Sequence, residues 1–143
     1  MIDLSNITLY ILLGLMGFIS LIVFQWQLQV IRGKTMKNPD GSVDSYKEQK
    51  IFYGIAIADL LLSIPVTLVG IIMIFIAPTW GHFLLILVSF WFVWANLMTT
   101  ATSLKFEKPK ITLLWIITFP FGSLVGLAYI IWVILHFETI FLT

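Results

Sequence analysis

Residues 51–77 read IFYGIAIADLLLSIPVTLVGIIMIFIA, an apolar run with a single ionisable residue, Asp59. A helix needs roughly 20 residues to cross the hydrocarbon core of a membrane, which is about 30 Å thick. Because lipid offers no hydrogen bonds to the backbone, such a segment satisfies its N–H and C=O groups by becoming a helix. The stretch therefore predicts a membrane-spanning helix that carries a carboxyl group.

Three further stretches have the same apolar character, at residues 7–31, 83–104 and 111–135. The whole chain has 143 residues, of which 60% are hydrophobic and 10% are charged, whereas soluble domains carry roughly 25% charged residues. We therefore expect residues 1–143 to form one domain, an all-α integral membrane protein whose main partner is the lipid bilayer. The fold predicted is an up-and-down bundle of four transmembrane helices, because short links join the successive runs.

The positive charges predict the orientation of this bundle. All eight Lys and Arg residues lie within residues 32–50 and 105–110, and loops rich in Lys and Arg face the cytoplasm. Both basic loops, including the one sizeable loop at residues 32–45, are therefore expected to be cytoplasmic, with the N-terminus and C-terminus extracytoplasmic. Such short basic loops do not favour a nucleic-acid partner. The absence of sorting and lipidation motifs favours a prokaryotic cytoplasmic membrane.

Asp59 is the most informative residue of the chain. An unpaired carboxylate at the bilayer centre costs at least about 2.5 to 3.5 kcal/mol on insertion scales, and no Lys or Arg lies in the apolar runs to pair with it. Asp59 should therefore be protonated, partnered or in contact with water. Small and polar side chains share its helical face and predict that this face contacts protein rather than lipid: Ala56, Ser63, Val66, Thr67 and Gly70.

The depth of Asp59 predicts its partner. Asp59 lies eight residues after Ile51, and Asn96 lies eight residues before Leu104 in the next, antiparallel helix. At 1.5 Å per residue, both side chains are about 12 Å from the cytoplasmic ends of their helices. We expect an Asp59–Asn96 contact that serves as an ion or proton site. The remaining predicted members are Thr100 and Ser63 in the site, and Gln27, Thr99 and Thr118 at its periphery.

Pro65 and Pro120 are expected to kink the second and fourth helices near the depth of Asp59. Two kinks around a buried acid could open a small cavity, although proline kinks also occur in inert membrane helices. The aromatic residues from Phe90 to Trp94 are interpreted as packing and lipid-facing side chains, with a hydrophobic ligand site as the alternative.

Two small-residue motifs predict close helix packing. They are Gly122-x-x-x-Gly126 and the weaker Gly54-x-x-x-Ala58. The first interpretation is packing within the bundle, and the alternative is an interface in a homo-oligomer.

A weaker set of polar residues lies on the extracytoplasmic side. His82, His136 and Glu138 are weak candidates for a metal site, and the two imidazoles are weaker candidates for haem ligands. Histidines beside Trp80 and Trp132 are more typical of the aromatic belt at a membrane interface. The sequence therefore predicts no metal and no cofactor.

Enzymatic function is disfavoured, because the chain carries no nucleophile with a base, no paired carboxylates and no phosphate-binding loop. Three hypotheses remain. The favoured one is an oligomeric transporter or channel that uses the intramembrane carboxylate of Asp59 as a proton or cation site. The alternatives are a structural or accessory subunit of a larger membrane complex, and a membrane protein that binds a lipid-like ligand.

Overall fold

The computed structural model describes residues 4–33, 53–107 and 111–142. The described residues contain helices and no strand. Residues 53–58 are helical and lead directly into the π-helical turn η1. In chain order the labelled elements are α1 (Leu4–Ile31), η1 (Asp59–Ser63), α3 (Ile64–Ile76), α4 (Pro78–Thr102), η2 (Ser103–Glu107), α5 (Leu113–Thr118), α6 (Pro120–Leu135) and α7 (Phe137–Phe141).

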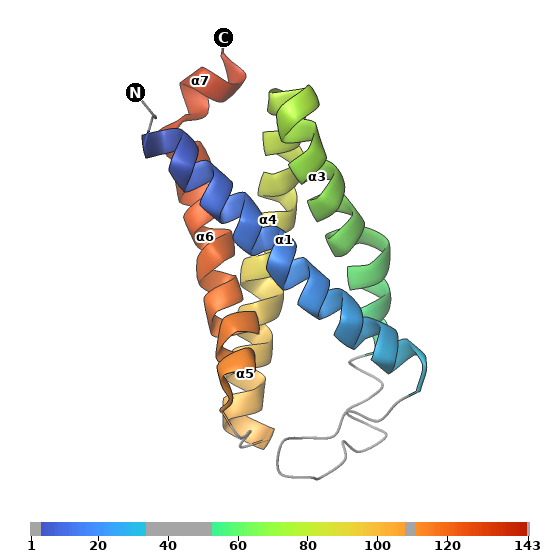
Figure 1. Cartoon of the computed structure of the whole chain (residues 1–143). Coiled ribbons are helices and arrows are strands. Elements are labelled where there is room, and N and C mark those ends of the chain that lie inside the picture. The colour runs from blue at the N-terminus through green and yellow to red at the C-terminus, as the bar shows by residue number, and fades with distance from the viewer. Residues whose placement is uncertain (1–3, 34–52, 108–110, 143) are drawn as a thin grey trace.

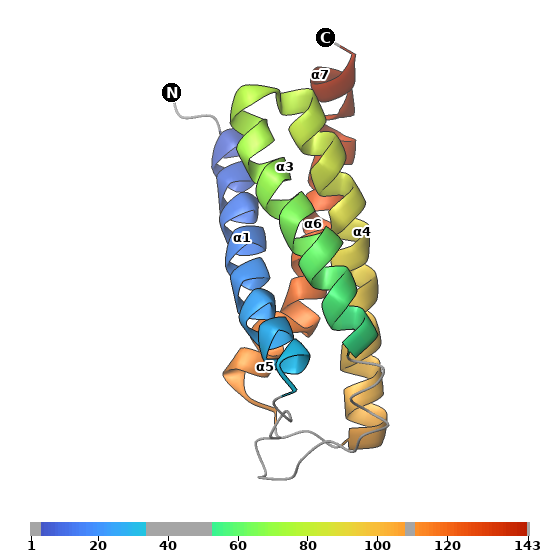
Figure 2. The same ribbon diagram turned by 90° about the vertical axis from the view of Figure 1, so that its right-hand side faces the viewer.

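Four spans are long and apolar enough to cross a membrane: Asn6–Ile31, Tyr53–Ile76, Pro78–Lys105 and Leu113–Leu135. The prediction of an all-helical chain with four such helices is confirmed. Successive spans run in opposite directions, and the start of α1 lies at the same end of the bundle as the end of α6 (Figures 1 and 2). These features indicate an integral membrane protein. The predicted loop at residues 32–45 lies outside the described residues from residue 34 onward.

The second span changes its helical winding at Asp59. Within η1 the N–H of Ile64 donates to the carbonyl of Asp59, five residues earlier. Pro65 follows directly, and a proline in a regular helix would lack its own N–H donor and press its ring against the carbonyl of Leu61. The wider π turn accommodates that ring. Such turns are frequent at functional sites, and this one begins at the residue singled out by the sequence.

The link between the second and third spans is shorter than the sequence suggested. Residues 78–82, which separate the predicted helices at 51–77 and 83–104, instead form the first turn of α4, which begins at Pro78. Proline fits the first helical position because its missing N–H would have had no intrahelical partner there. A Cβ at Gly81 would lie 2.5 Å from the backbone nitrogen of Ile74. Only glycine therefore allows α3 and α4 to approach this closely.

The fourth span continues as one helix from Leu113 to Leu135, with a local irregularity at Phe119, where a kink at Pro120 was predicted. α5 ends at Thr118 and α6 begins at Pro120, with Phe119 between them. Pro120 cannot donate a backbone hydrogen bond, but Phe119 keeps a right-handed helical backbone and donates its N–H to the carbonyl of Trp115. The span also begins at Leu113 rather than at residue 111, because the hydroxyl of Thr112 accepts the N–H of Trp115 and caps the helix. Phe119 lies beside the interior of the bundle.

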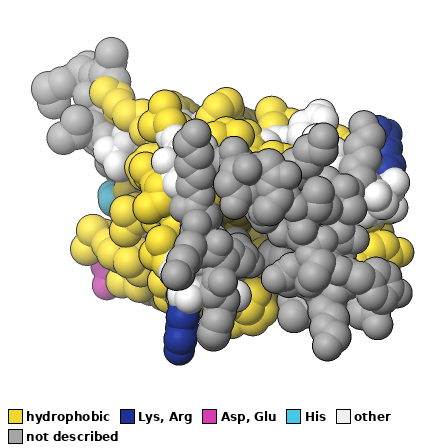
Figure 3. Space-filling model, turned by 90° about the horizontal axis from the view of Figure 1, so that it is seen from below, with side chains coloured by type: hydrophobic (Ala, Val, Ile, Leu, Met, Phe, Trp, Pro, Cys, Tyr) yellow, Lys and Arg dark blue, Asp and Glu magenta, His cyan; other side chains and the backbone are white. Residues whose placement is uncertain are grey.

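The interior and the exterior are both largely apolar. Met16, Ile19, Leu85, Tyr129 and Val133 are fully buried at the centre. Large hydrophobic side chains also cover the outside of the helices, and the view from below shows them around the described part of the surface (Figure 3). A soluble monomer rarely exposes so much contiguous apolar area. This outer surface suits lipid, and it leaves the bundle interior as the place where polar groups collect.

Candidate functional site

A series of polar side chains is buried inside the bundle, each at most 8% exposed. The helical face predicted to contact protein is indeed buried at Ala56, Asp59, Ser63, Thr67 and Gly70. The buried polar residues are Ser20, Asp59, Ser63, Thr67, His82, Ser89, Asn96, Ser103 and Thr118.

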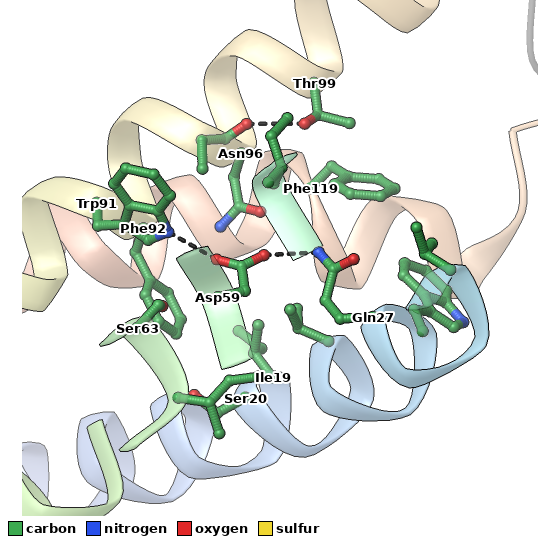
Figure 4. Close-up of a pocket in the computed structure, with 16 residues that line it drawn as sticks. Ile19, Ser20, Gln27, Asp59, Ser63, Trp91, Phe92, Asn96, Thr99 and Phe119 are labelled. Atoms are coloured by element: carbon green, nitrogen blue, oxygen red, sulfur yellow. Dashed lines mark hydrogen bonds between the residues drawn. The ribbon is translucent and has the colours of Figure 1, made fainter. Parts of the chain in front are cut away.

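The carboxyl group of Asp59 lies at the centre of the candidate site and is 5% exposed. The indole N–H of Trp91 donates to its Oδ1 at 2.7 Å, and the side-chain amide of Gln27 donates to its Oδ2 at 2.6 Å (Figure 4). Among the described residues, these two neutral donors are its hydrogen-bonding partners. The two bonds connect α1, η1 and α4 through one acidic side chain.

A cavity of about 70 Å³ opens beside this carboxyl. A volume of this size holds on the order of two to five water-sized groups. The cavity lies in the half of the bundle nearest the segments that carry all Lys and Arg residues, because its lining comes from the end of α1, the start of the second span and the end of α4. Its polar lining is Ser20, Gln27, Asp59, Ser63, Asn96 and Thr99, and its aromatic lining is Trp26, Trp91, Phe92 and Phe119.

Ser20 of α1 also lines this cavity, and its hydroxyl has no hydrogen-bond partner. The residue is 2% exposed. In Figure 4 it lies on the opposite side of the Asp59 carboxyl from Asn96. Ser20 is not among the site residues predicted from the sequence. The available signal was its spacing of seven residues from Gln27, which places both side chains on one face of α1.

Asn96 lies at the predicted depth but makes a different contact from the one expected. It lines the same cavity as Asp59 and is 8% exposed. The hydrogen bonds of Asp59 nevertheless go to Gln27 and Trp91 rather than to Asn96. The Asn96 amide packs over Gly122 of α6, where an added Cβ would lie 2.7 Å from its Nδ2. The absence of a side chain at Gly122 thus provides the space for this amide.

The other predicted polar residues divide into two groups. Ser63 and Thr99 line the cavity. Thr100 and Thr118 do not, and their hydroxyls donate to carbonyls four residues earlier in their own helices, at 2.7 Å to Asn96 and 2.9 Å to Leu114. Hydroxyls bonded back to the helix in this way are common for threonine in an apolar interior.

Trp91 is a second residue of the site that was not predicted from the sequence. Trp91 and Asn96 are five residues apart, which corresponds to about 140° around a helix. Periodicity therefore assigned them to different faces, and Trp91 was interpreted as a packing or lipid-facing residue. The long indole side chain bridges that angle and reaches Asp59 with its N–H.

The glycines of α6 lie where this helix meets α4. A Cβ at Gly126 would lie 2.9 Å from the carbonyl oxygen of Ser89 and from Cβ of Phe92. By contrast, a Cβ at Gly54 would have no described atom within 4 Å, and Ala58 is only partly buried. Gly122 and Gly126 thus permit the close approach of α6 to the helix that carries Trp91 and Asn96.

The histidines at the other end of the bundle form an aromatic stack. Nδ1 of His82 lies 2.8 Å from the hydroxyl of Tyr129. Trp132 stacks on both histidines, with ring centroids 5.5 Å from His82 and 4.2 Å from His136. Within residues 4–33, 53–107 and 111–142, no group of three or more His, Cys, Asp or Glu could hold a metal ion, and Glu138 is exposed.

Fold and site together define a helical bundle with an apolar exterior and four spans of membrane length, in which the described residues include one buried carboxyl, beside a polar cavity. Comparison with models of protein families, with curated proteins and with solved structures found no match for this chain. The function is therefore argued from the chemistry of the site.

Proposed function

We propose that this protein is a small membrane transporter or channel in which Asp59 takes up a proton or a cation. The observation that carries the proposal is a buried carboxyl, held by neutral donors, beside a polar cavity within four spans of membrane length. Ionisable residues inside membrane helices are costly and typically mark ion or proton pathways.

The partners of Asp59 suit a group that gains and loses a proton. An indole N–H can only donate, so Oδ1 accepts the bond from Trp91 whether or not the carboxyl is protonated. The Gln27 amide has both a donor and an acceptor. It donates to Oδ2 as observed, and after rotation it can accept a proton carried on that oxygen. Both protonation states of Asp59 therefore keep their hydrogen bonds.

Irregular backbone lies beside the site in two of the four spans. η1 begins at Asp59, and Phe119, between α5 and α6, lines the cavity. Membrane transporters commonly place discontinuous helices around their ion and substrate sites. The π turn at Asp59 and the proline after Phe119 give the helices around Asp59 positions at which their packing can change.

The same proposal extends to the half of the membrane that contains the cavity and to the oligomeric state of the protein. The positive-inside rule places the cavity in the cytoplasmic half of the membrane, and a prokaryotic cytoplasmic membrane is the expected location. A cavity of about 70 Å³ in one chain is too small for a continuous pathway. We therefore propose that the working form is an oligomer.

The test is proton or cation flux in proteoliposomes that contain the purified full chain. Wild-type protein should pass protons or cations, and Asp59→Asn should abolish this flux while circular dichroism and size-exclusion profiles remain unchanged. Glu138→Gln is the matched control, because it removes an exposed acid outside the cavity. Undiminished flux in Asp59→Asn would refute the proposal.

One observation favours a second candidate, a structural or accessory subunit of a larger membrane complex. The two hydrogen bonds of Asp59 join three helical segments, as a purely stabilising polar contact would. In this case Asp59→Asn should leave the activity of the larger complex unchanged. The protein should also co-purify with partner subunits from native membranes.

A further inference from the structure

The cavity beside Asp59 combines one acidic group with a mostly apolar wall. Asp59 is the one charged residue in the described lining, which contains no Lys, Arg or His. Aromatic side chains line the cavity from three parts of the bundle, with Trp26 from α1, Trp91 from α4 and Phe119 between α5 and α6. Aliphatic side chains such as Ile55 adjoin them. A ligand that neutralises the carboxylate here is therefore a cation that tolerates apolar contacts.

The polar atoms of the lining are spread around the carboxyl rather than gathered on one side of it. Ser20 and Asn96 lie on opposite sides of Asp59 (Figure 4), and the Ser20 Oγ is buried. An alkali ion gives up its water only where several oxygen ligands surround it together. With a full shell of water, such an ion exceeds a cavity of about 70 Å³. The lining thus disfavours a metal ion.

The hydrogen bonds of Asp59 narrow the kind of cation further. Both carboxylate oxygens already accept a bond, one from Trp91 and one from Gln27. A primary ammonium or a guanidinium brings several N–H donors, and each donor that is buried without an acceptor is costly. A fully methylated ammonium has no N–H, so the charge of the carboxylate attracts it without a free lone pair. Its methyl groups also suit aromatic surroundings.

The size of the cavity matches a small member of this class. A volume of about 70 Å³ holds on the order of two to five water-sized groups. Tetramethylammonium, a nitrogen surrounded by methyl groups, lies at the upper end of this range. Its single charge balances that of Asp59, whereas a divalent ion would leave a net positive charge in the apolar interior.

We infer that this cavity binds a small methylated ammonium ion, held by the charge of the Asp59 carboxylate and by the apolar wall around it. The inference rests on the proposed function and deepens it by naming the class of cation. A free ion and the trimethylammonium headgroup of a choline lipid share this chemistry.

The test is equilibrium binding of radiolabelled tetramethylammonium to the purified full chain in nanodiscs whose lipids contain no choline. Sodium chloride holds the ionic strength constant, so an alkali cation competes throughout. Two unlabelled competitors separate the contributions. tert-Butanol has a similar size but no charge, and methylammonium has the charge but brings N–H donors.

Two substitutions test the charge and the space separately. Asp59→Asn removes the charge, and Ala95→Leu fills the cavity from α4 without changing any charge. The matched controls are Glu138→Gln, at an exposed acid outside the cavity, and Ala101→Leu, at an exposed position on the same helix.

Wild-type protein should bind tetramethylammonium saturably. Both test variants should weaken this binding on the order of tenfold or more, which corresponds to about 1.4 kcal/mol, and both controls should bind like wild type. tert-Butanol and methylammonium should each displace the label on the order of tenfold less effectively than unlabelled tetramethylammonium.

No saturable binding to wild type would overturn the inference, and so would equal binding by wild type and Asp59→Asn. Displacement by either competitor as effective as that by unlabelled tetramethylammonium would also overturn it. Proton or alkali-cation flux that depends on Asp59, without tetramethylammonium binding, would overturn the inference while preserving the proposed function. Binding that depends on Asp59, without any flux, would refute transport but retain the site.

Repeating the measurement in nanodiscs that contain phosphatidylcholine separates the two sources of the ion. Unchanged binding of tetramethylammonium would assign the site to a free ion. Loss of binding would assign it to the headgroup of a choline lipid, and both results retain the inferred class of ligand.

Discussion

Trp91 donates its indole N–H to Oδ1 of Asp59 at 2.7 Å, across the interface between α4 and the start of η1. The bond fixes the orientation of a carboxyl that would otherwise lie unpartnered in an apolar bundle. The bonds from Trp91 and Gln27 together hold the carboxylate so that one of its sides faces the cavity.

Trp91→Phe keeps an aromatic ring but removes the donor to Asp59. Hydrogen bonds between membrane helices are typically worth about 0.6 kcal/mol, with a maximum near 1.7. We therefore expect the free energy of unfolding to fall by about 1 kcal/mol, measured by denaturation in mild detergent. Trp80→Phe is the control, because Trp80 is 62% exposed and lies outside the cavity. Equal losses in both variants would count against the bond.

Gly122→Ala should disturb the site from the opposite helix. The new Cβ would lie 2.7 Å from Nδ2 of Asn96, so the amide must shift. Overpacking of this kind costs about 1 to 3 kcal/mol, and we expect a lower thermal stability together with a changed environment of the cavity tryptophans in fluorescence spectra.

Gly54→Ala is the matched control for that substitution. Its Cβ would meet no described atom within 4 Å, and alanine favours a helix by roughly 0.5 to 1 kcal/mol over glycine. It should be neutral or stabilising. If Gly54→Ala destabilises as much as Gly122→Ala, the close approach of α6 and α4 is not the cause.

Tyr129→Phe tests the polar contact at the other end of the bundle. Tyr129 is fully buried, and its hydroxyl lies 2.8 Å from Nδ1 of His82. Removing the hydroxyl leaves a buried ring nitrogen without its partner, at a cost of about 1 to 3 kcal/mol. Thermal unfolding should show this loss, whereas Tyr53→Phe, at a half-exposed position, should be silent. Loss of flux with unchanged stability would instead assign Tyr129 a functional role.

Ser20→Ala should not destabilise the fold. The Ser20 hydroxyl is buried without a partner, and an unsatisfied buried polar group costs about 1 to 3 kcal/mol. The variant should melt at the same temperature as wild type or higher. A clear loss of stability would mean that Ser20 has a structural partner.

The four spans were predictable because apolar length alone distinguishes a membrane helix from other structures. The common depth of Asp59 and Asn96 was also predictable, because the helical rise is constant, and both residues line one cavity. Of the two hydrogen-bonding partners of Asp59, Gln27 was predicted at the periphery of the site, and Trp91 was not predicted. Trp91 reaches Asp59 through the length and rotamer of its side chain, which the spacing of residues along a helix does not encode.

The helix boundaries show a second limit of sequence reasoning. A proline fits both a turn and the first position of a helix, so Pro78 did not reveal that α4 begins there. Pro120 predicted a kink, and the irregular position is the preceding residue, Phe119, between α5 and α6. Packing against neighbouring helices decides whether such a proline begins a turn or a helix.

If Asp59 takes up a proton in transport, its carboxyl must exchange that proton with solvent through the cavity. An infrared pH titration of the purified protein in bilayers tests this exchange, because subtraction of Asp59→Asn spectra assigns the Asp59 carboxyl band. We expect the C=O stretch of the protonated carboxyl to appear and disappear reversibly as the pH is changed. A carboxyl band that stays the same at every accessible pH would contradict it and leave Asp59 as a sealed contact between helices.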